Sequence, residues 1–233
     1  MLEDESDRPR PHAHRARGSA RALRAARAAR AFGAARALLA SSVLALAVAC
    51  ARAPEVPLEP AELPAPRAGT ELLGRELLPL LPARFLGAPP EIAGHVVLVR
   101  WWTDGCPFCE RSLPALDALV NRERARGLVG VGVYHPKPPR AVDDAHVRAA
   151  ADRLAWTGAV AIDADWSALK AAWLGGAERE ATSVTFLLDR AGRVRWIHPG
   201  PELHPSDDEA HADCARDFAE LERAVRALLD ERP

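Results

Sequence analysis

The chain has almost no net charge and no long apolar segment. Its 31 Lys and Arg residues are offset by 32 Asp and Glu residues, and this balance argues against a nucleic-acid partner. The apolar run at residues 37–49 has 13 residues, whereas a membrane-spanning helix needs about 20. Cysteine is scarce, with four residues in 233, and no internal repeat is visible. The length suits one globular domain with an appendage.

Residues 1–50 are typical of an export signal. The first 36 residues hold nine arginines and four acidic residues, and the apolar run follows them directly. The run ends at Cys50 after small residues, which resembles the lipobox of bacterial lipoproteins. We therefore expect Cys50 to carry a lipid as the first residue of the mature protein. The alternative is an ordinary cleaved signal or a retained helix, with Cys50 incidental.

The rest of the chain divides into a tether and a folded domain. Residues 51–69 are rich in Pro, Ala and Glu, which predicts an extended tether, and residues 70–233 form the domain. The leucine pairs at 71–87 favour an edge segment or a short helix that covers a sheet. Apolar periodicity then predicts strands at 96–102, 128–134, 159–162, 184–188 and 193–198, and helices at 107–126, 144–154, 166–173 and 208–231. This order predicts an α/β sandwich with buried parallel strands.

The strongest chemical signal is VVLVRWWTDGCPFC at residues 96–109. If the apolar part is a strand, Cys106 lies at the start of the next helix, where free N–H groups and the helix dipole favour a thiolate. Such a position lowers a thiol pKa from about 8.5 and makes the sulfur a nucleophile. Cys109 lies one helical turn further and can close a short disulfide with Cys106. Pro107 lacks an N–H and suits the first turn.

Two segments resemble the thioredoxin superfamily, in particular its TlpA-like, membrane-anchored thiol–disulfide oxidoreductases. They are VVLVRWWTDGCPFC with Pro114, and TSVTFLLDRAG followed by RVRWIHPG, within about residues 90–230. The resemblance implies a thioredoxin-like three-layer α/β/α sandwich with a central mixed sheet. It also implies a lipid-anchored, extracytoplasmic (periplasmic) monomer that needs no cofactor. Its partners would be the thiols and disulfides of exported proteins, with electrons from a membrane donor.

Three positions depart from the family pattern. Ser183 stands where relatives have a cis proline, and a cis bond before a non-proline residue costs about 2.5–4 kcal/mol. We therefore expect a trans Thr182–Ser183 bond and altered client docking there. Arg100 replaces a buried carboxylate, and it either points to the thiols and stabilises Cys106 as thiolate or pairs with a surface acid. Gly105 replaces a bulky residue and opens the approach to Cys106.

Three other interpretations compete with redox exchange. A non-catalytic binding module could use the two cysteines as a structural disulfide or metal clip, and the missing proline favours it. A peroxiredoxin-like peroxidase would use Thr103 before Cys106, but Val99 holds its proline position and Cys109 is foreign to its motif.

A metal site is the third interpretation. His211 and Cys214 share a helix face, and together with His204, Cys106 and Cys109 they could bind a metal. The same face continues the apolar stripe, so we predict no metal and a buried, inert Cys214, with a metal ligand or a third redox thiol as alternatives. Trp102 is the tryptophan expected to contact the disulfide, and His198 and His204 are expected to be loop residues.

Overall fold

The computed structural model describes residues 67–176 and 179–232. The predicted signal, Cys50 and the tether up to residue 66 lie outside the described residues, so their predictions stay open. Within the described segments, every helix is too short or too polar to cross a bilayer.

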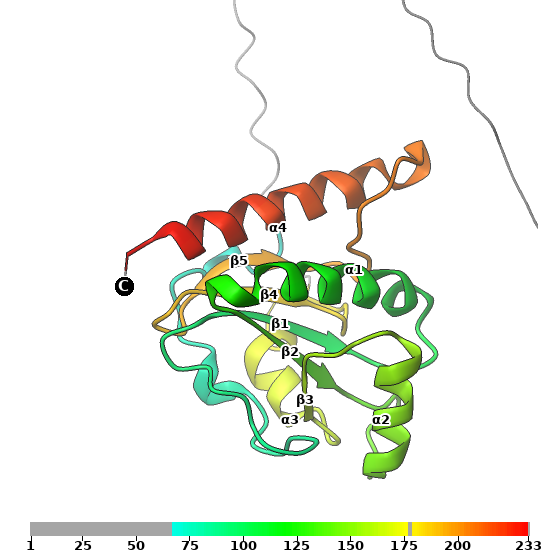
Figure 1. Cartoon of the computed structure of the whole chain (residues 1–233). Coiled ribbons are helices and arrows are strands. Elements are labelled where there is room, and N and C mark those ends of the chain that lie inside the picture. The colour runs from blue at the N-terminus through cyan, green and yellow to red at the C-terminus, as the bar shows by residue number, and fades with distance from the viewer. Residues whose placement is uncertain (1–66, 177–178, 233) are drawn as a thin grey trace, which may run out of the picture. The chain divides into compact units, whose positions relative to one another are not determined.

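A five-stranded mixed sheet forms the centre of the domain (Figure 1). Strand β1 (Val96–Trp102) pairs in parallel with β2 (Leu128–Tyr134), and β2 pairs in parallel with β3 (Ala159–Ile162). On its other side β1 pairs antiparallel with β4 (Thr185–Leu188), which continues antiparallel into β5 (Val194–His198). The order β3-β2-β1-β4-β5 places β1 in the middle. The predicted mixed sheet is confirmed.

Helices cover both faces of this sheet. Figure 1 shows α1 (Pro107–Glu123) and α4 (Ala212–Asp230) on one face and α3 (Ser167–Leu169) on the other. Helix α2 (Asp144–Arg153) packs into the same apolar cluster as α1 and α4. Helices on both faces of a central sheet make three layers. The predicted thioredoxin-like α/β/α sandwich is confirmed.

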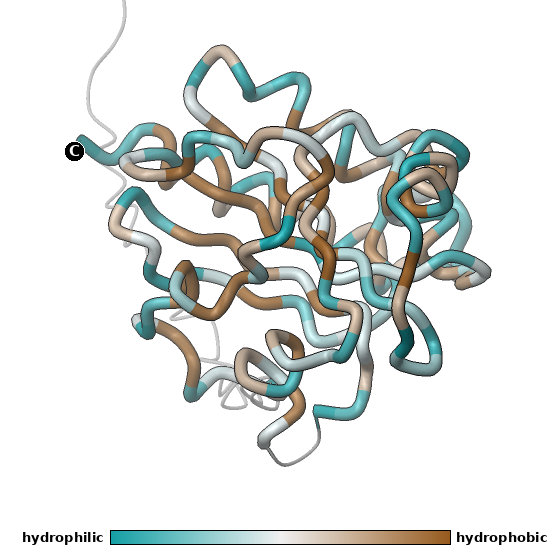
Figure 2. Tube along the Cα trace, turned by 90° about the horizontal axis from the view of Figure 1, so that it is seen from below, coloured by the Kyte–Doolittle hydropathy of each residue, from teal (hydrophilic) through white to brown (hydrophobic). Residues whose placement is uncertain are grey.

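The side chains of β1 alternate between the two cores. Val96, Leu98 and Trp102 belong to the cluster that contains Cys109 and the apolar faces of α1 and α4. The intervening Val97, Val99 and Trp101 belong to the cluster on the opposite face. Figure 2 shows the strands as apolar segments in the middle of the trace. Because successive side chains of a strand point to opposite faces, Arg100 points to the face of the cysteines.

The segment at residues 71–87 covers the sheet, as predicted. It contains two short 3₁₀ helices, Thr70–Leu72 and Leu78–Leu80, and Leu72 and Leu77 are buried in the cluster opposite the cysteines. Single backbone bridges join Glu76 to Arg193 and Phe85 to Ala161. The segment therefore seals the second core without adding a full strand.

Three predicted helices change type near their ends. The first one finishes as a 3₁₀ turn at Arg124–Arg126, and the last one begins with a 3₁₀ turn at Glu209–His211. The third helix starts as α3 and continues as a π turn at Lys170–Leu174. The carboxylate of Asp163 accepts hydrogen bonds from the backbone N–H groups of Ala168 and Leu169, and it thereby fixes the start of α3.

Gly132 in β2 offers a test of core packing. A Cβ atom at this position would lie 2.8 Å from the indole nitrogens of both Trp102 and Trp156. We expect Gly132→Ala to lower the free energy of unfolding by about 1–3 kcal/mol, because neither tryptophan can retreat in a filled core. Gly175→Ala is the control, since its nearest atom would be 3.6 Å away. Guanidinium denaturation of both variants measures the difference, and equal stabilities would contradict the packing argument.

Candidate active site

Cys106 is the N-cap residue of α1 and is half-buried. Its φ and ψ are −103° and 109°, and Pro107 follows at the first helical position. The backbone N–H of Cys109 points to the Cys106 sulfur at 3.4 Å. Gly105 is exposed with φ +66°, and nothing lies within 4 Å of where its Cβ would be. The sulfur is thus open to an incoming disulfide, as the sequence predicts from Gly105.

Cys109 is fully buried and faces Ser183. The Cys109 sulfur lies 3.4 Å from the Ser183 hydroxyl, and the side chain of Cys106 lies close to it. The two cysteines are not joined by a disulfide in this structure. Among the described residues the one cis bond is Lys137–Pro138, and the prediction of a trans Thr182–Ser183 bond is confirmed. A hydroxyl therefore occupies the place that a proline ring would fill.

Arg100 is completely buried beside the cysteines. Its guanidinium donates hydrogen bonds to the carbonyl of Ser183 and the hydroxyl of Thr185, both at 2.9 Å, and to the carbonyl of Pro201. Burial lowers the pKa of Arg100, and the negative charges of Cys109 and Cys106 oppose this change. No carboxylate of the described segments forms an ion pair with it. Of the two predicted orientations, the one toward the thiols is correct.

The buried sulfur has the lower pKa. Hydrogen bonding from the Cys106 side chain lowers the pKa of Cys109 to about 5, with the charge of Arg100 and the Ser183 hydroxyl helping against burial. The hydrogen bond with Cys109 raises the pKa of Cys106, and burial adds to this effect. Hydrogen bonding and the charge of Arg100 thus favour ionisation of Cys109 over that of Cys106.

The assignment of Cys106 as the attacking thiolate stays a prediction. The helix start predicts Cys106 as the thiolate, and the backbone N–H groups of Phe108 and Cys109 do favour its charge. Arg100, however, stabilises Cys109, because β1 directs the guanidinium beneath the helix rather than to its rim. Groups on both sides of the pair thus favour a thiolate, the helix start at Cys106 and Arg100 at Cys109.

Several polar groups border the dithiol that sequence patterns do not single out. Asp104 accepts hydrogen bonds from the Tyr134 hydroxyl at 2.8 Å and from His146 at 2.9 Å. These bonds outweigh burial and lower the pKa of Asp104. His135 is buried behind the site and its Nε2 lies 3.0 Å from the Thr182 carbonyl. Asp104 and His135 each follow one of two parallel strands. This position after a strand is the one feature of the sequence from which their place beside the site could have been predicted.

The rim of the site is aromatic. Phe108 is 41% exposed beside Cys106, and the Arg111 guanidinium lies 5.6 Å from the centre of its ring. Trp102 is fully buried and packs in the same cluster as both cysteines. Thr103, on which a peroxidase depends, hydrogen-bonds Cys109 through its backbone, and its buried hydroxyl has no partner in the described part of the chain.

Cys214 is half-exposed, so the prediction of a buried Cys214 is wrong. The apolar stripe of α4 begins one turn later, at Phe218, and the first turn faces a loop instead of the sheet. Here Cys214 lies close to His204, His211 and Glu202. No sequence pattern identifies Glu202 as a possible metal ligand. This cluster does not include Cys106 or Cys109.

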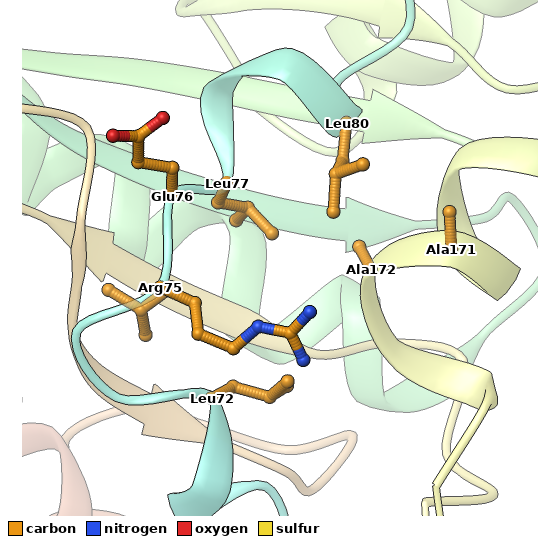
Figure 3. Close-up of a pocket in the computed structure, with 8 residues that line it drawn as sticks. Leu72, Arg75, Glu76, Leu77, Leu80, Ala171 and Ala172 are labelled. Carbon is orange, nitrogen blue, oxygen red and sulfur yellow. The ribbon is translucent and has the colours of Figure 1, made fainter.

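A small cavity lies elsewhere in the domain (Figure 3). It has about 20 Å³ of space, which is enough for a water molecule but not for an organic ligand. It is lined by Leu72, Arg75, Glu76, Leu77, Leu80, Ala171, Ala172 and Val194. Leu72, Leu77, Ala172 and Val194 belong to the apolar cluster on the face of the sheet opposite the cysteines, so the cavity is not a part of the active site.

Solved structures with a similar fold come from several bacteria. A thiol:disulfide interchange protein of Chlorobium tepidum is 18% identical, covering 63% of this chain and 90% of its own, with a TM-score of 0.46. A secreted disulfide oxidoreductase of Mycobacterium tuberculosis is 17% identical, covering 62% and 93%, with a TM-score of 0.44. A secreted thiol-disulfide isomerase of Corynebacterium glutamicum is 16% identical, covering 65% and 86%, with a TM-score of 0.49. A search of curated protein sequences gives no significant match.

A thioredoxin-like sheet with two adjacent thiols at the start of its first helix defines a thiol–disulfide oxidoreductase. The profile of the Redoxin family matches residues 90–214, which is more than half of the 233 residues. The chain belongs to the Redoxin family. The resemblance to the thioredoxin superfamily is thereby confirmed, and membrane anchoring stays a prediction.

The lowered pKa of Cys109 predicts how the reduction potential of the Cys106–Cys109 pair varies with pH. Below about pH 5 reduction of the Cys106–Cys109 disulfide takes up two protons, and above it Cys109 stays ionised and only one is taken up. We expect the midpoint potential to fall by about 59 mV per pH unit below this break and by about 30 mV per unit above it. Redox equilibration with dithiothreitol over a pH series measures both slopes.

Arg100→Met should move the break to higher pH, because the positive charge beside Cys109 is lost. Arg100→Lys is the control that retains the charge and should leave the break near its original pH. Circular dichroism checks the folding of both variants. A single slope for the original protein across this pH range would contradict the assignment of the proton.

Proposed function

We propose that the protein exchanges thiols and disulfides with exported proteins through the C-P-F-C dithiol of Cys106 and Cys109. One observation carries this proposal: a half-buried sulfur at a helix start lies beside a buried sulfur one helical turn away. Proteins are suitable clients, because Gly105 leaves open space beside Cys106 and the exposed ring of Phe108 can contact a polypeptide.

The reaction starts from a dithiol in which Cys106 is protonated and Cys109 is a thiolate. When a client disulfide approaches, the Cys106 proton moves to the Cys109 thiolate and the Cys106 sulfur attacks. A mixed disulfide forms between Cys106 and the client, and the first client sulfur leaves as a thiolate. This thiolate takes the proton from the Cys109 thiol, so that Cys109 is again a thiolate. The Cys109 thiolate then attacks Cys106 and releases the second client thiolate. Two electrons reduce the client, and the enzyme ends as a disulfide.

The surroundings of Cys109 influence the potential of this couple. Arg100 and the Ser183 hydroxyl stabilise the thiolate, which exists only in the reduced form. A stabilised reduced form makes the disulfide a stronger oxidant. The protein is therefore more oxidising than it would be with an uncharged residue at position 100.

Client docking uses the backbone next to the dithiol. The Thr182–Ser183 bond is trans and the Ser183 carbonyl already accepts from Arg100. Pro107 and Phe108 are exposed on the other side of Cys106, and Trp102 supports the site from below. We assign the docking and tuning roles to Arg100, Trp102, Pro107, Thr182 and Ser183.

The proposed location is the periplasmic side of a membrane. The basic, apolar leader and the small residues before Cys50 support export and attachment of a lipid, and residues 51–69 supply a tether. The domain works as a monomer there, and a membrane protein with exchangeable thiols returns the dithiol to its reduced state.

Substitution of each cysteine tests the roles in exchange. Cys106→Ser should abolish reduction of a peptide–glutathione mixed disulfide by the full chain, because the attacking sulfur is missing. Cys109→Ser should instead trap a mixed disulfide on Cys106, which mass spectrometry of the intact protein detects. Unchanged rates in Cys106→Ser would remove the proposed activity, and a trap in neither variant would remove the division of roles.

The lipid anchor has its own test. Cys50→Ser should move the protein expressed in a bacterial host from the membrane fraction to the soluble periplasmic fraction, since the attachment atom is lost. Ser41→Ala, within the same leader, is the control and should leave the protein in the membrane fraction. Membrane association that persists in Cys50→Ser would count against a lipid on this residue.

A further inference from the structure

Four side chains with metal-binding atoms meet at the start of α4, outside the dithiol. They are Glu202 and His204 from the loop after β5, His211 from the 3₁₀ turn, and Cys214 from the first turn of the helix. One ligand atom from each lies within 4.8 Å of all the others. The rings of His204 and His211 are 5.1 Å apart between centroids.

The hydrogen bonds of His204 leave its Nε2 facing an acceptor. Its Nδ1 lies 2.9 Å from the Pro205 carbonyl, which can only accept, so Nδ1 carries a proton. Its Nε2 lies 2.9 Å from a carboxylate oxygen of Glu202, which also only accepts. In a neutral ring, Nε2 and this oxygen are two acceptors that face each other. Either a second proton on the ring or a metal ion at Nε2 removes this conflict, and a metal ion suits a ring that already donates from Nδ1.

The Pro205 contact is also the usual support of a metal-bound histidine. A ligating imidazole nearly always donates its other N–H to a carbonyl or a carboxylate, which fixes the ring. Glu202 is supported in the same way, because Arg111 donates to its Oε1. In the described chain the contacts of Glu202 with His204, His211 and Arg111 all use Oε1, which leaves Oε2 for a metal.

The donor set matches zinc. Two imidazoles, a thiolate and a carboxylate are the ligands of tetrahedral Zn²⁺, with metal distances of about 2.0–2.3 Å. Such a site places its ligand atoms about 3.3–3.8 Å apart. The present cluster must contract by about 1 Å, and rotation of the side chains of His211 and Cys214 suffices because both are partly exposed.

The loop that carries the cluster is held by the rest of the domain. The N–H of Leu203 donates to the Ser112 hydroxyl at 2.8 Å, and the Pro201 carbonyl accepts from Arg100. The side chains of Glu202 and His204 are only 15% and 11% exposed. Asp213 and Asp217 add negative charge around Cys214. The ligands are thus positioned in advance, in surroundings that favour a cation.

We propose that Glu202, His204, His211 and Cys214 bind one Zn²⁺ ion. This differs from the sequence prediction, which favours no metal. The site is independent of thiol exchange, because it shares no residue with the dithiol. It fixes the loop after β5 to the start of α4.

Zinc titration of the full chain with both Cys106→Ser and Cys109→Ser tests the site, since the active-site thiols then cannot bind metal. The protein is reduced, freed of metal and titrated with zinc sulfate against a chromophoric chelator. We expect one Zn²⁺ per chain, and replacement by Co²⁺ should give a thiolate charge-transfer band. No bound zinc, or cobalt binding without that band, would overturn the proposal.

Further substitutions in the same background locate the ion. Loss of supporting partners costs about 10–100-fold in affinity, so removal of a ligand by Cys214→Ser or His204→Gln should weaken binding by at least about 100-fold. His95→Gln is the matched control outside the cluster and should bind as before. Circular dichroism checks folding, and His211→Gln replaces any variant that fails this check. Unchanged affinity in the folded ligand variants would show that zinc binds elsewhere and would overturn the proposal.

Discussion

The site depends on one buried guanidinium in the central strand. A charge removed from water costs several kcal/mol unless it is compensated, and Arg100 has no carboxylate partner among the described residues. Its compensation comes from the Ser183 and Pro201 carbonyls, the Thr185 hydroxyl and the negative charge on Cys109. The charge of Arg100 and a thiolate on Cys109 therefore favour each other.

This arrangement joins parts of the chain that are distant in sequence. Arg100 lies on β1, and its acceptors lie at the start of β4 and in the loop after β5. The same contacts position Ser183 against the Cys109 sulfur. The sheet thus accommodates a buried cation on its central strand, because the backbone around it presents carbonyl groups.

Local patterns predict most of the fold but only part of the site. The strands and the position of Cys106 follow from apolar runs and from Pro107, which act within a few residues. The direction of Arg100 follows from strand alternation only once the face covered by α1 is known. The partial exposure of Cys214 could not be predicted, because the first turn of α4 packs against an irregular loop and not against the sheet. Glu202 joins that cluster from a segment with no regular pattern, so its role is visible only in three dimensions.

Arg111 makes contacts on both sides of its position in α1. Its guanidinium lies over the ring of Phe108 beside the dithiol and also donates to Glu202 in the loop after β5. Because one guanidinium makes both contacts, the position of the Arg111 side chain ties the most exposed part of the helix start to a loop about 90 residues later in the chain.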